Sequence, residues 1–117
     1  MALHIVERQS GSVTVLELSG RITLGEESVE LRNRLKALFA SKPRQVLDMG
    51  NLTYIDSAGL GTLVASYTTA ANQGVRMVLA NLTKRLHEQL SITKLVTVFE
   101  VYDSVDDAVK SFETSKQ

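Results

Sequence analysis

Short β-rich runs alternate with amphipathic helical patterns along this chain, and that alternation is the feature that most constrains its fold. Two β-rich runs, residues 3–8 and 13–18, are separated by a Gln-Ser-Gly-Ser turn and predict an antiparallel hairpin. Strands and helices then follow in the order ββαβαβαβα. This order is typical of an α/β fold in which helices pack on a mostly parallel central sheet.

The first predicted helix follows Gly20. Thr23 and Glu26 have the spacing of a capping box, in which a hydroxyl and a carboxylate bind free backbone amides at a helix start. An apolar stripe then repeats at helical spacing, and we expect the helix to end before Pro43. The stripe comprises Leu31, Leu35, Leu38 and Phe39.

A short apolar run at residues 46–49 predicts a central strand that is covered on both faces. Residues 51–55 then lead into a second helix, which is expected to start at Ser57. Gly74 stands where a left-handed residue commonly ends a helix. The apolar stripe of this helix, interpreted as core packing, comprises Leu60, Leu63, Val64, Tyr67 and Ala71.

The last third of the chain predicts two more strands and two more helices. The strands are expected at 75–80 and 96–101, and the helix between them is capped by Asn81 or Thr83. Ser104, followed by acidic residues, has the pattern of an N-cap for the final helix. The prediction is therefore four helices and an N-terminal hairpin on one sheet.

The length and the charge balance limit what the chain can do. A chain of 117 residues has the commonest size for one domain, so residues 1–117 are expected to form a single domain with a polar, frayed tail at 114–117. Thirteen basic residues balance 13 acidic ones, which leaves no long-range field to attract nucleic acid or a membrane surface. The function is expected to depend on local recognition.

The absence of cysteine excludes disulfides, thiolate metal sites and cysteine nucleophiles. Residues 1–9 lack the apolar core of a signal peptide, and no stretch approaches the roughly 20 apolar residues that span a bilayer. We therefore expect a cytoplasmic protein that does not enter the membrane.

The most informative stretch is residues 51–61, in which Ser57 stands between an apolar segment and a helix. Such a serine is ordinarily an N-cap. Its neighbours add a second interpretation, because Ala58 and Gly59 have almost no side chain to shield the hydroxyl and Gly61 keeps the first helical turn open. Ser57 is therefore a candidate for modification by a kinase as well as a cap.

A phosphate on Ser57 would face the positive end of the helix dipole, so the fold could accommodate it. It would also lie beside Asp56, adding like charge to a surface that a partner must desolvate. Like-charge contacts at an interface cost several kcal/mol. Tolerance by the fold combined with rejection at an interface is what a reversible switch requires.

Catalytic interpretations of this segment fail on residue type, and the protein is not expected to be an enzyme. A nucleophile elbow needs glycine two residues before Ser57, where Ile55 stands, and the only histidines are His4 and His87. The glycines after Ser57 match a dinucleotide fingerprint poorly, since its last position is Val64. No catalytic residue, cofactor or metal is assigned, and calcium-loop spacing is absent from Asp48, Asp56, Asp103, Asp106 and Asp107.

These motifs together resemble the STAS domain, and specifically the stand-alone bacterial anti-sigma factor antagonists. The signature is Asp56-Ser57-Ala58-Gly59-Leu60 after a strand and at the start of a helix. The resemblance extends through nearly the whole chain and includes the N-terminal hairpin, Gly20, Leu31-Arg32 and Leu47-Asp48. It implies a single STAS-like domain over residues 1–117.

The resemblance also implies a mechanism. Ser57 would be phosphorylated by an anti-sigma factor that is itself a serine kinase, and a PP2C-type phosphatase would reverse the reaction. The dephosphorylated protein would bind the anti-sigma factor and free a sigma factor. The loop that contains Thr23 would join the partner surface, although its Arg-Ile-Thr-Leu sequence departs from the Leu-Asp common in the family. The recognition surface would comprise Asp56, Ala58, Gly59, Leu60 and Gly61.

Several alternatives stay open at this point. Asp56 could orient the Ser57 hydroxyl or repel its phosphate. The chain could be a constitutive scaffold in which Ser57 is only a cap, or it could bind a nucleotide or another small ligand at the helix start. Whether the chain forms a homodimer through a sheet edge also stays open.

Overall fold

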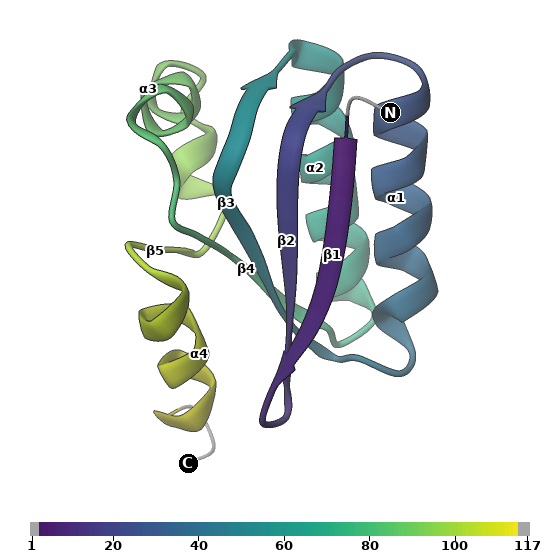
Figure 1. The fold of residues 1–117 in the computed structure, drawn as a ribbon, viewed down its shortest axis with the longest axis vertical. Helices are drawn as coiled ribbons and strands as arrows, with labels where there is room; N and C mark the ends of the chain where they lie inside the picture. The colour runs from purple at the N-terminus through teal and green to yellow at the C-terminus, as the bar shows by residue number, and fades with distance from the viewer. Residues whose placement is uncertain (1–2, 115–117) are drawn as a thin grey trace.

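The computed structural model describes residues 3–114, and these form one α/β layer structure (Figure 1). The sheet has the strand order β1-β2-β3-β4-β5, with β1 antiparallel to β2 and every other neighbouring pair parallel. The predicted fold class, a mostly parallel sheet with an N-terminal hairpin and four α-helices, is confirmed over the described residues. The elements are β1 (Leu3–Ser10), β2 (Val13–Ile22), α1 (Glu26–Phe39), β3 (Arg44–Ile55), α2 (Ser57–Asn72), β4 (Arg76–Ala80), α3 (Lys84–Ile92), the 3-10 helix η1 (Leu95–Thr97), β5 (Val101–Tyr102) and α4 (Val105–Thr114).

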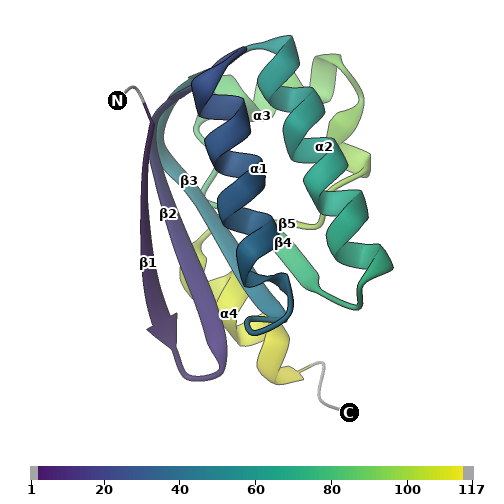
Figure 2. The ribbon, with the colours of Figure 1, turned by 90° about the vertical axis from the view of Figure 1, so that its right-hand side faces the viewer.

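The inner strands β2, β3 and β4 are buried on both faces where helices cover the sheet from either side. Figure 2 shows α1 and α2 together over one face, and α4 on the other. Alternate residues of the strands point to opposite faces. The face toward α1 and α2 carries a row of paired leucines, and the face toward α4 a row of paired valines; these rows are Leu16, Leu47 and Leu79, and Val15, Val46 and Val78.

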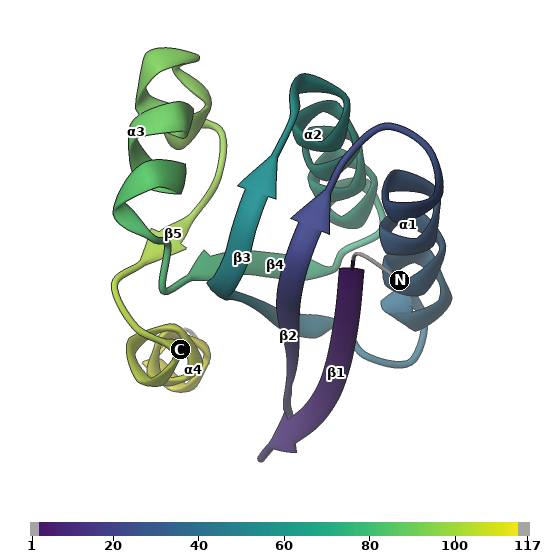
Figure 3. The same cartoon turned by 45° about the horizontal axis from the view of Figure 1, so that its top comes forward.

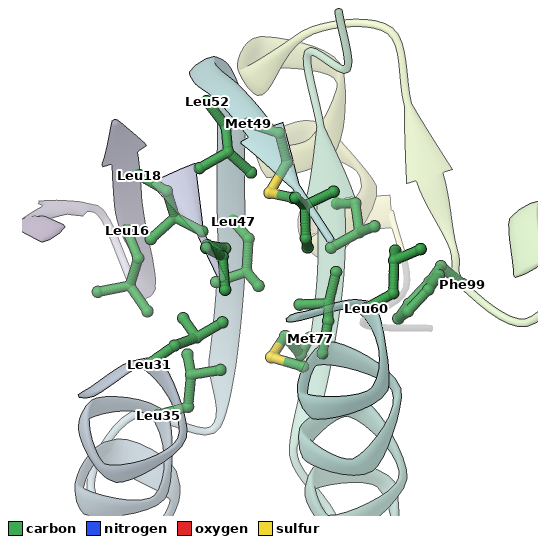
Figure 4. Packing of buried hydrophobic residues seen from close by; sticks show 14 of the residues in the cluster. Leu16, Leu18, Leu31, Leu35, Leu47, Met49, Leu52, Leu60, Met77 and Phe99 are labelled. Atoms are coloured by element: carbon green, nitrogen blue, oxygen red, sulfur yellow. The ribbon is translucent and has the colours of Figure 1, made fainter. Parts of the chain in front are cut away.

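The larger core lies between the sheet and the helices α1, α2 and α3. Figure 4 shows Leu31 and Leu35 of α1 facing the leucines of the sheet, with Leu60 of α2 beside Phe99. The predicted core stripes are confirmed with one exception. Ala71 is exposed, and Ala70 is the alanine that α2 buries.

The strand β3 is longer than predicted. It continues to Ile55, where a loop was expected, and its pairing with β2 shifts register in this part. Leu52 and Ile55 are both buried, so the apolar residues of this segment extend the strand by packing into the core. The extension matters because it carries the chain to Asp56 at the end of a rigid element.

The last predicted strand exists as β5, but the bounds predicted for it, 96–101, are wrong. Lys94 has a left-handed conformation, φ 63°, the chain continues as η1, and it becomes extended only at Val101 and Tyr102. The reason is tertiary packing, since Phe99 is buried in the core. Its ring packs edge-to-face on the ring of Tyr67, with 5.0 Å between the two ring centroids. The short β5 then completes the sheet.

The starts of α3 and α4 and the end of α2 follow the predicted caps. Thr83 accepts a hydrogen bond from the backbone N–H of Leu86, and Ser104 accepts one from that of Asp107. Gly74 has the expected positive φ, 76°, after α2. Of the tail predicted to fray, residue 114 ends α4 and residues 115–117 lie outside the described part of the chain.

The capping box predicted for α1 is wrong. The N-cap is Gly25, φ 107°, and no side chain caps this helix start. Thr23 instead donates a hydrogen bond from Oγ1 to Glu27 Oε1 at 2.6 Å, and Ser28 Oγ donates to the Thr23 carbonyl at 2.8 Å. The N-cap position is therefore two residues further along the chain than predicted.

Candidate functional site

The site is built where β2 and β3 end side by side. These strands are parallel, and Ile22 pairs with Ile55 at their carboxyl ends. The chain leaves β2 toward α1 and leaves β3 toward α2, so the two loops lie next to each other (Figure 3). The backbone N–H of Asp56 donates to the Ile22 carbonyl at 3.2 Å and fixes this arrangement.

Asp56, and not Ser57, caps α2. Asp56 has an extended backbone, φ −92° and ψ −179°, and its Oδ1 accepts the backbone N–H of Gly59 at 2.7 Å. Ser57 is already the first residue of the helix. The prediction that Ser57 is the N-cap is therefore wrong by one residue, and the hydroxyl of Ser57 is not needed to satisfy the helix start.

The carboxylate of Asp56 also binds the neighbouring loop. Its Oδ2 accepts the backbone N–H of Leu24 at 3.0 Å. The hydrogen bonds from Gly59 and then from Leu24 hold the pKa of the Asp56 carboxyl below its ordinary value, because both favour the charged form. Each carboxylate oxygen thus has a backbone donor, and a fixed negative charge stands next to Ser57.

Ser57 is exposed to solvent at the start of α2. Ala58 beside it is half-buried, and Gly61 on the next turn is exposed, with no atom within 4 Å of the position that a Cβ would occupy. The surroundings of the hydroxyl are therefore small side chains. A kinase or a partner surface can approach Ser57 closely.

Gly59 and Leu60 lie beneath this surface. A Cβ on Gly59 would stand 2.5 Å from the Ile22 carbonyl oxygen, so only glycine lets α2 start this close to the end of β2. Leu60 is 6% exposed and packs into the core. These two residues shape the site from below, while Asp56, Ser57, Ala58 and Gly61 reach its surface.

The loop between β2 and α1 adds an apolar residue that the sequence did not single out. Thr23 is half-buried, but the side chain of Leu24 is 78% exposed, with its backbone held by Asp56. Val29, one turn into α1, is 46% exposed and lines an open groove of about 760 Å³ that begins at Gly25. The only sequence signal for Leu24 was a large apolar residue in a loop.

The site is supported from the α3 side as well. Gln89 donates from Nε2 to the carbonyl oxygen of Ile55 at 2.8 Å. This bond satisfies the last backbone acceptor of β3 before the chain turns into α2. The position of Ser57 is therefore fixed by contacts from β2, from the β2–α1 loop and from α3.

No catalytic arrangement appears around Ser57 within residues 3–114. His4 lies on β1, two strands away from β3, and His87 is an exposed residue of α3. Across the same residues, no group of three or more His, Cys, Asp or Glu side chains is arranged to hold a metal ion. None of the helices in this range has both the length and the apolar character needed to cross a membrane.

Two curated proteins are similar to the chain over most of its length. A STAS-domain-containing protein of Pseudomonas aeruginosa is 25% identical over 101 residues, covering 86% of this chain and 99% of that protein. The anti-sigma F factor antagonist of Paenibacillus polymyxa is 26% identical over 117 residues, covering 97% of each. The similarity thus covers nearly the whole length of both proteins.

Solved structures have the same fold. An anti-sigma factor antagonist from Mycobacterium paratuberculosis superposes with a TM-score of 0.74 at 23% identity, covering 93% of this chain and 92% of that one. The phosphorylated form of the Bacillus cell fate determinant SpoIIAA superposes with a TM-score of 0.71 at 14% identity, covering 95% and 99%. The family model described as the STAS domain matches residues 4–108, and the chain belongs to the STAS domain family.

Proposed function

We propose that this protein is an anti-sigma factor antagonist whose binding is switched off by phosphorylation of Ser57. The observation that carries the proposal is the exposed hydroxyl of Ser57 on the first residue of α2, beside a charged carboxylate and among small side chains. The full-length similarity to a protein named anti-sigma F factor antagonist supports the role. The protein acts by binding and not by catalysis.

The fold can accept a phosphate at this position. The start of a helix carries a partial positive charge, which favours an anion on its first turn. Ser57 does not cap α2, so modification of its hydroxyl breaks no bond that holds the helix start. The modified protein therefore stays folded, as the phosphorylated state of a reversible switch must.

The same phosphate opposes binding. A phosphoserine carries about −1.5 to −2 charges at neutral pH, and here it would join the fixed charge of Asp56 one residue away. A partner that docks over Ser57 must desolvate both charges and make room for the added group. Each ~1.4 kcal/mol of that cost weakens binding about tenfold.

The partner surface extends from the start of α2 across the neighbouring loop. It combines the small residues Ser57, Ala58 and Gly61 with the half-buried Thr23 and the exposed side chain of Leu24. Leu24 supplies the large apolar contact that the small residues lack, and buried apolar anchors carry much of the energy of an interface. Asp56 serves this surface as a clamp and as the charge that a phosphate would reinforce.

The partners follow from this mechanism. The unphosphorylated protein binds a cytoplasmic anti-sigma factor that is also a serine kinase, and the captured anti-sigma factor releases its sigma factor. Phosphorylation of Ser57 by that kinase ends the interaction, and a PP2C-type phosphatase restores it. Both enzymes act on the same exposed hydroxyl.

The test is to incubate the purified protein with ATP and each serine-kinase anti-sigma factor of its own cell, and to measure intact mass with peptide mapping. We expect one phosphate, located at Ser57, and none in Ser57→Ala. The matched control is Ser91→Ala, which removes another exposed serine from a helix and should leave phosphorylation unchanged. Phosphate at another site, or none with any kinase, contradicts the switch.

Binding should follow the phosphorylation state. Ser57→Ala is expected to bind the anti-sigma factor permanently in the presence of ATP, whereas Ser57→Asp and Ser57→Glu bind weakly. If all three variants bind like wild type, Ser57 does not control the interface and the constitutive scaffold becomes the better account. Saturable binding of a nucleotide to the free protein, weakened in Ser57→Asp, would instead favour the small-ligand alternative.

A further inference from the structure

The outer edge of β1 is open along its length. Within the described residues β1 stands at the end of the sheet and pairs with β2 alone (Figure 3). Its eight residues pair in an unbroken register, and they include neither Pro nor Lys. Sheets usually protect their edges with short strands, bulges, prolines or charged side chains, lysine above all. The opposite edge has such protection, since β5 has only two residues, whereas β1 is long and unbroken. The charged side chains of β1 are Glu7 and Arg8, and Arg8 already pairs with Glu17.

The geometry of the hairpin turn determines which backbone groups of β1 face the open edge of the sheet. Ser10 pairs with Val13 across a two-residue turn, in which Gly11 has φ 61° as a type II′ turn requires. The pair next to such a turn is hydrogen-bonded, and bonded and non-bonded pairs alternate along an antiparallel ladder. The residues that bond to β2 are therefore His4, Val6, Arg8 and Ser10, and those that present N–H and C=O to the open edge are Ile5, Glu7 and Gln9.

We propose that two copies of this chain pair antiparallel through their β1 edges, with Val6 opposite the second copy's Val6. In an antiparallel pair, two directly opposed residues have their side chains on the same face of the sheet, whereas neighbouring residues of one strand point to opposite faces. A two-fold symmetric pair of β1 strands must therefore set one residue opposite its own copy. Only registers centred on Val6 or Glu7 overlap nearly the whole strand. These two registers differ in which side chains they set opposite each other.

The register centred on Val6 brings compatible side chains together. Val6 is 55% exposed, and pairing covers this apolar side chain with its own copy. His4 comes opposite Arg8, whose charge already pairs with Glu17 at 2.7 Å within each copy. In the register centred on Glu7, two carboxylates face each other directly, which destabilises a strand pair. The zero net charge of the chain removes long-range repulsion between copies.

The proposed dimer is separate from the Ser57 site. β1 lies at the edge of the sheet, whereas Ser57 follows β3, two strands further in. The edge that pairs carries no residue of the proposed anti-sigma surface. The inference therefore does not rest on the phosphorylation switch, and Ser57→Asp is expected to self-associate like wild type.

A single cysteine tests the register directly because the chain contains none. In the proposed dimer Val6 and its copy form a non-hydrogen-bonded pair with Cα atoms about 4.5 Å apart, which is within the range a disulfide spans. Under mild oxidation, Val6→Cys should form a disulfide dimer about tenfold faster or more than Ser91→Cys, since pairing raises the local thiol concentration. Ser91→Cys, on the exposed surface of α3, reports random collision.

Glu7→Cys is the matched control for register. It should cross-link slowly, because the proposed pairing sets Glu7 opposite Ile5 of the second copy. Faster cross-linking of Glu7→Cys than of Val6→Cys would overturn the proposed register, and equal rates for Val6→Cys and Ser91→Cys would overturn the dimer itself.

Sedimentation velocity gives an independent measurement without cross-linking. Wild type should shift from monomer to dimer between about 1 µM and 1 mM, the range of weak interfaces. Val6→Lys should remain monomeric over that range, because a charged side chain on an open edge opposes pairing. Its thermal unfolding should match wild type, since Val6 is largely exposed in the monomer. A wild-type protein that stays monomeric at 1 mM would overturn the proposal.

Discussion

The backbone N–H of Leu24 donates to the carboxylate of Asp56 at 3.0 Å, and this bond joins two loops that are 32 residues apart in sequence. The other carboxylate oxygen of Asp56 caps α2 through Gly59. One side chain therefore orients both an exposed apolar residue and the helix start that carries Ser57. In the proposed interface, these are the two parts that a partner must meet at once.

Replacing Asp56 with alanine should lower the melting temperature and loosen the β2–α1 loop. The substitution removes the acceptor for Gly59 at the helix start and the acceptor for Leu24 in the loop. Thermal unfolding measures the first effect, and hydrogen exchange of the Leu24 amide measures the second. Asp103→Ala, which removes another exposed carboxylate, is the control and should change neither. Unchanged exchange at Leu24 would contradict the clamp.

Acid should remove the contribution of Asp56 to stability. Its pKa is lower in the folded protein than in the unfolded chain, because hydrogen bonds from Gly59 and Leu24 favour the carboxylate. The stabilisation is therefore fully present above the unfolded-state pKa and is lost as the pH falls through the folded-state pKa. Denaturant unfolding of wild type and Asp56→Ala between neutral and acidic pH should show the difference between them shrinking toward low pH. A constant difference would show that the charge of Asp56 is not what stabilises the fold.

Ser57→Ala should leave the free energy of unfolding within about 0.5 kcal/mol of wild type. Ser57 is exposed and Asp56 holds the cap, so no structural hydrogen bond depends on the hydroxyl. Urea unfolding measures this directly. A loss of about 1 kcal/mol, as expected for removal of an N-cap, would mean that Ser57 and not Asp56 stabilises the helix start.

Gly59→Ala and Gly61→Ala should have opposite effects although both lie in the first turns of α2. The new methyl on residue 59 meets the Ile22 carbonyl oxygen at 2.5 Å and Ile55 Cγ1 at 2.8 Å, which should cost about 1–3 kcal/mol. The methyl on residue 61 meets nothing within 4 Å, and the better helix propensity of alanine should add up to about 1 kcal/mol. Denaturant unfolding of the pair tests the close approach, and equal effects would refute it.

Leu24→Ser should weaken binding to the anti-sigma factor while leaving the fold intact. Leu24 is 78% exposed, so its loss removes little core packing, but as an interface anchor it should contribute about 1–2 kcal/mol, roughly five- to thirtyfold in affinity. Ile92→Ser is the matched control, because Ile92 is 82% exposed on α3, outside the proposed partner surface. Titration calorimetry with the unphosphorylated protein measures both. Equal binding by the two variants would remove Leu24 from the interface.

Local sequence signals were sufficient for most of the fold. The hairpin depends on a tight glycine-containing turn between two β-rich runs, and the caps at Thr83 and Ser104 depend on bonds to amides three residues away. The apolar stripes of the helices and the doubly covered central strand are likewise patterns within one element. For the same reason, the exposed hydroxyl of Ser57 could be expected from its small neighbours alone.

Tertiary contacts decided what the local patterns left undetermined. The carboxylate of Asp56 caps α2 through Gly59 and also binds the Leu24 amide from a distant loop, and Gly59 lies directly against the Ile22 carbonyl. The segment 96–101 is apolar enough to form a strand, but the packing of Phe99 against Tyr67 holds most of it in a different conformation. Sequence by itself therefore determined the elements and their order, because these follow from contacts within a few residues. Only the folded chain determined the starts of α1 and α2, the loop positions and the surface around Ser57, because these depend on atoms that meet across distant segments.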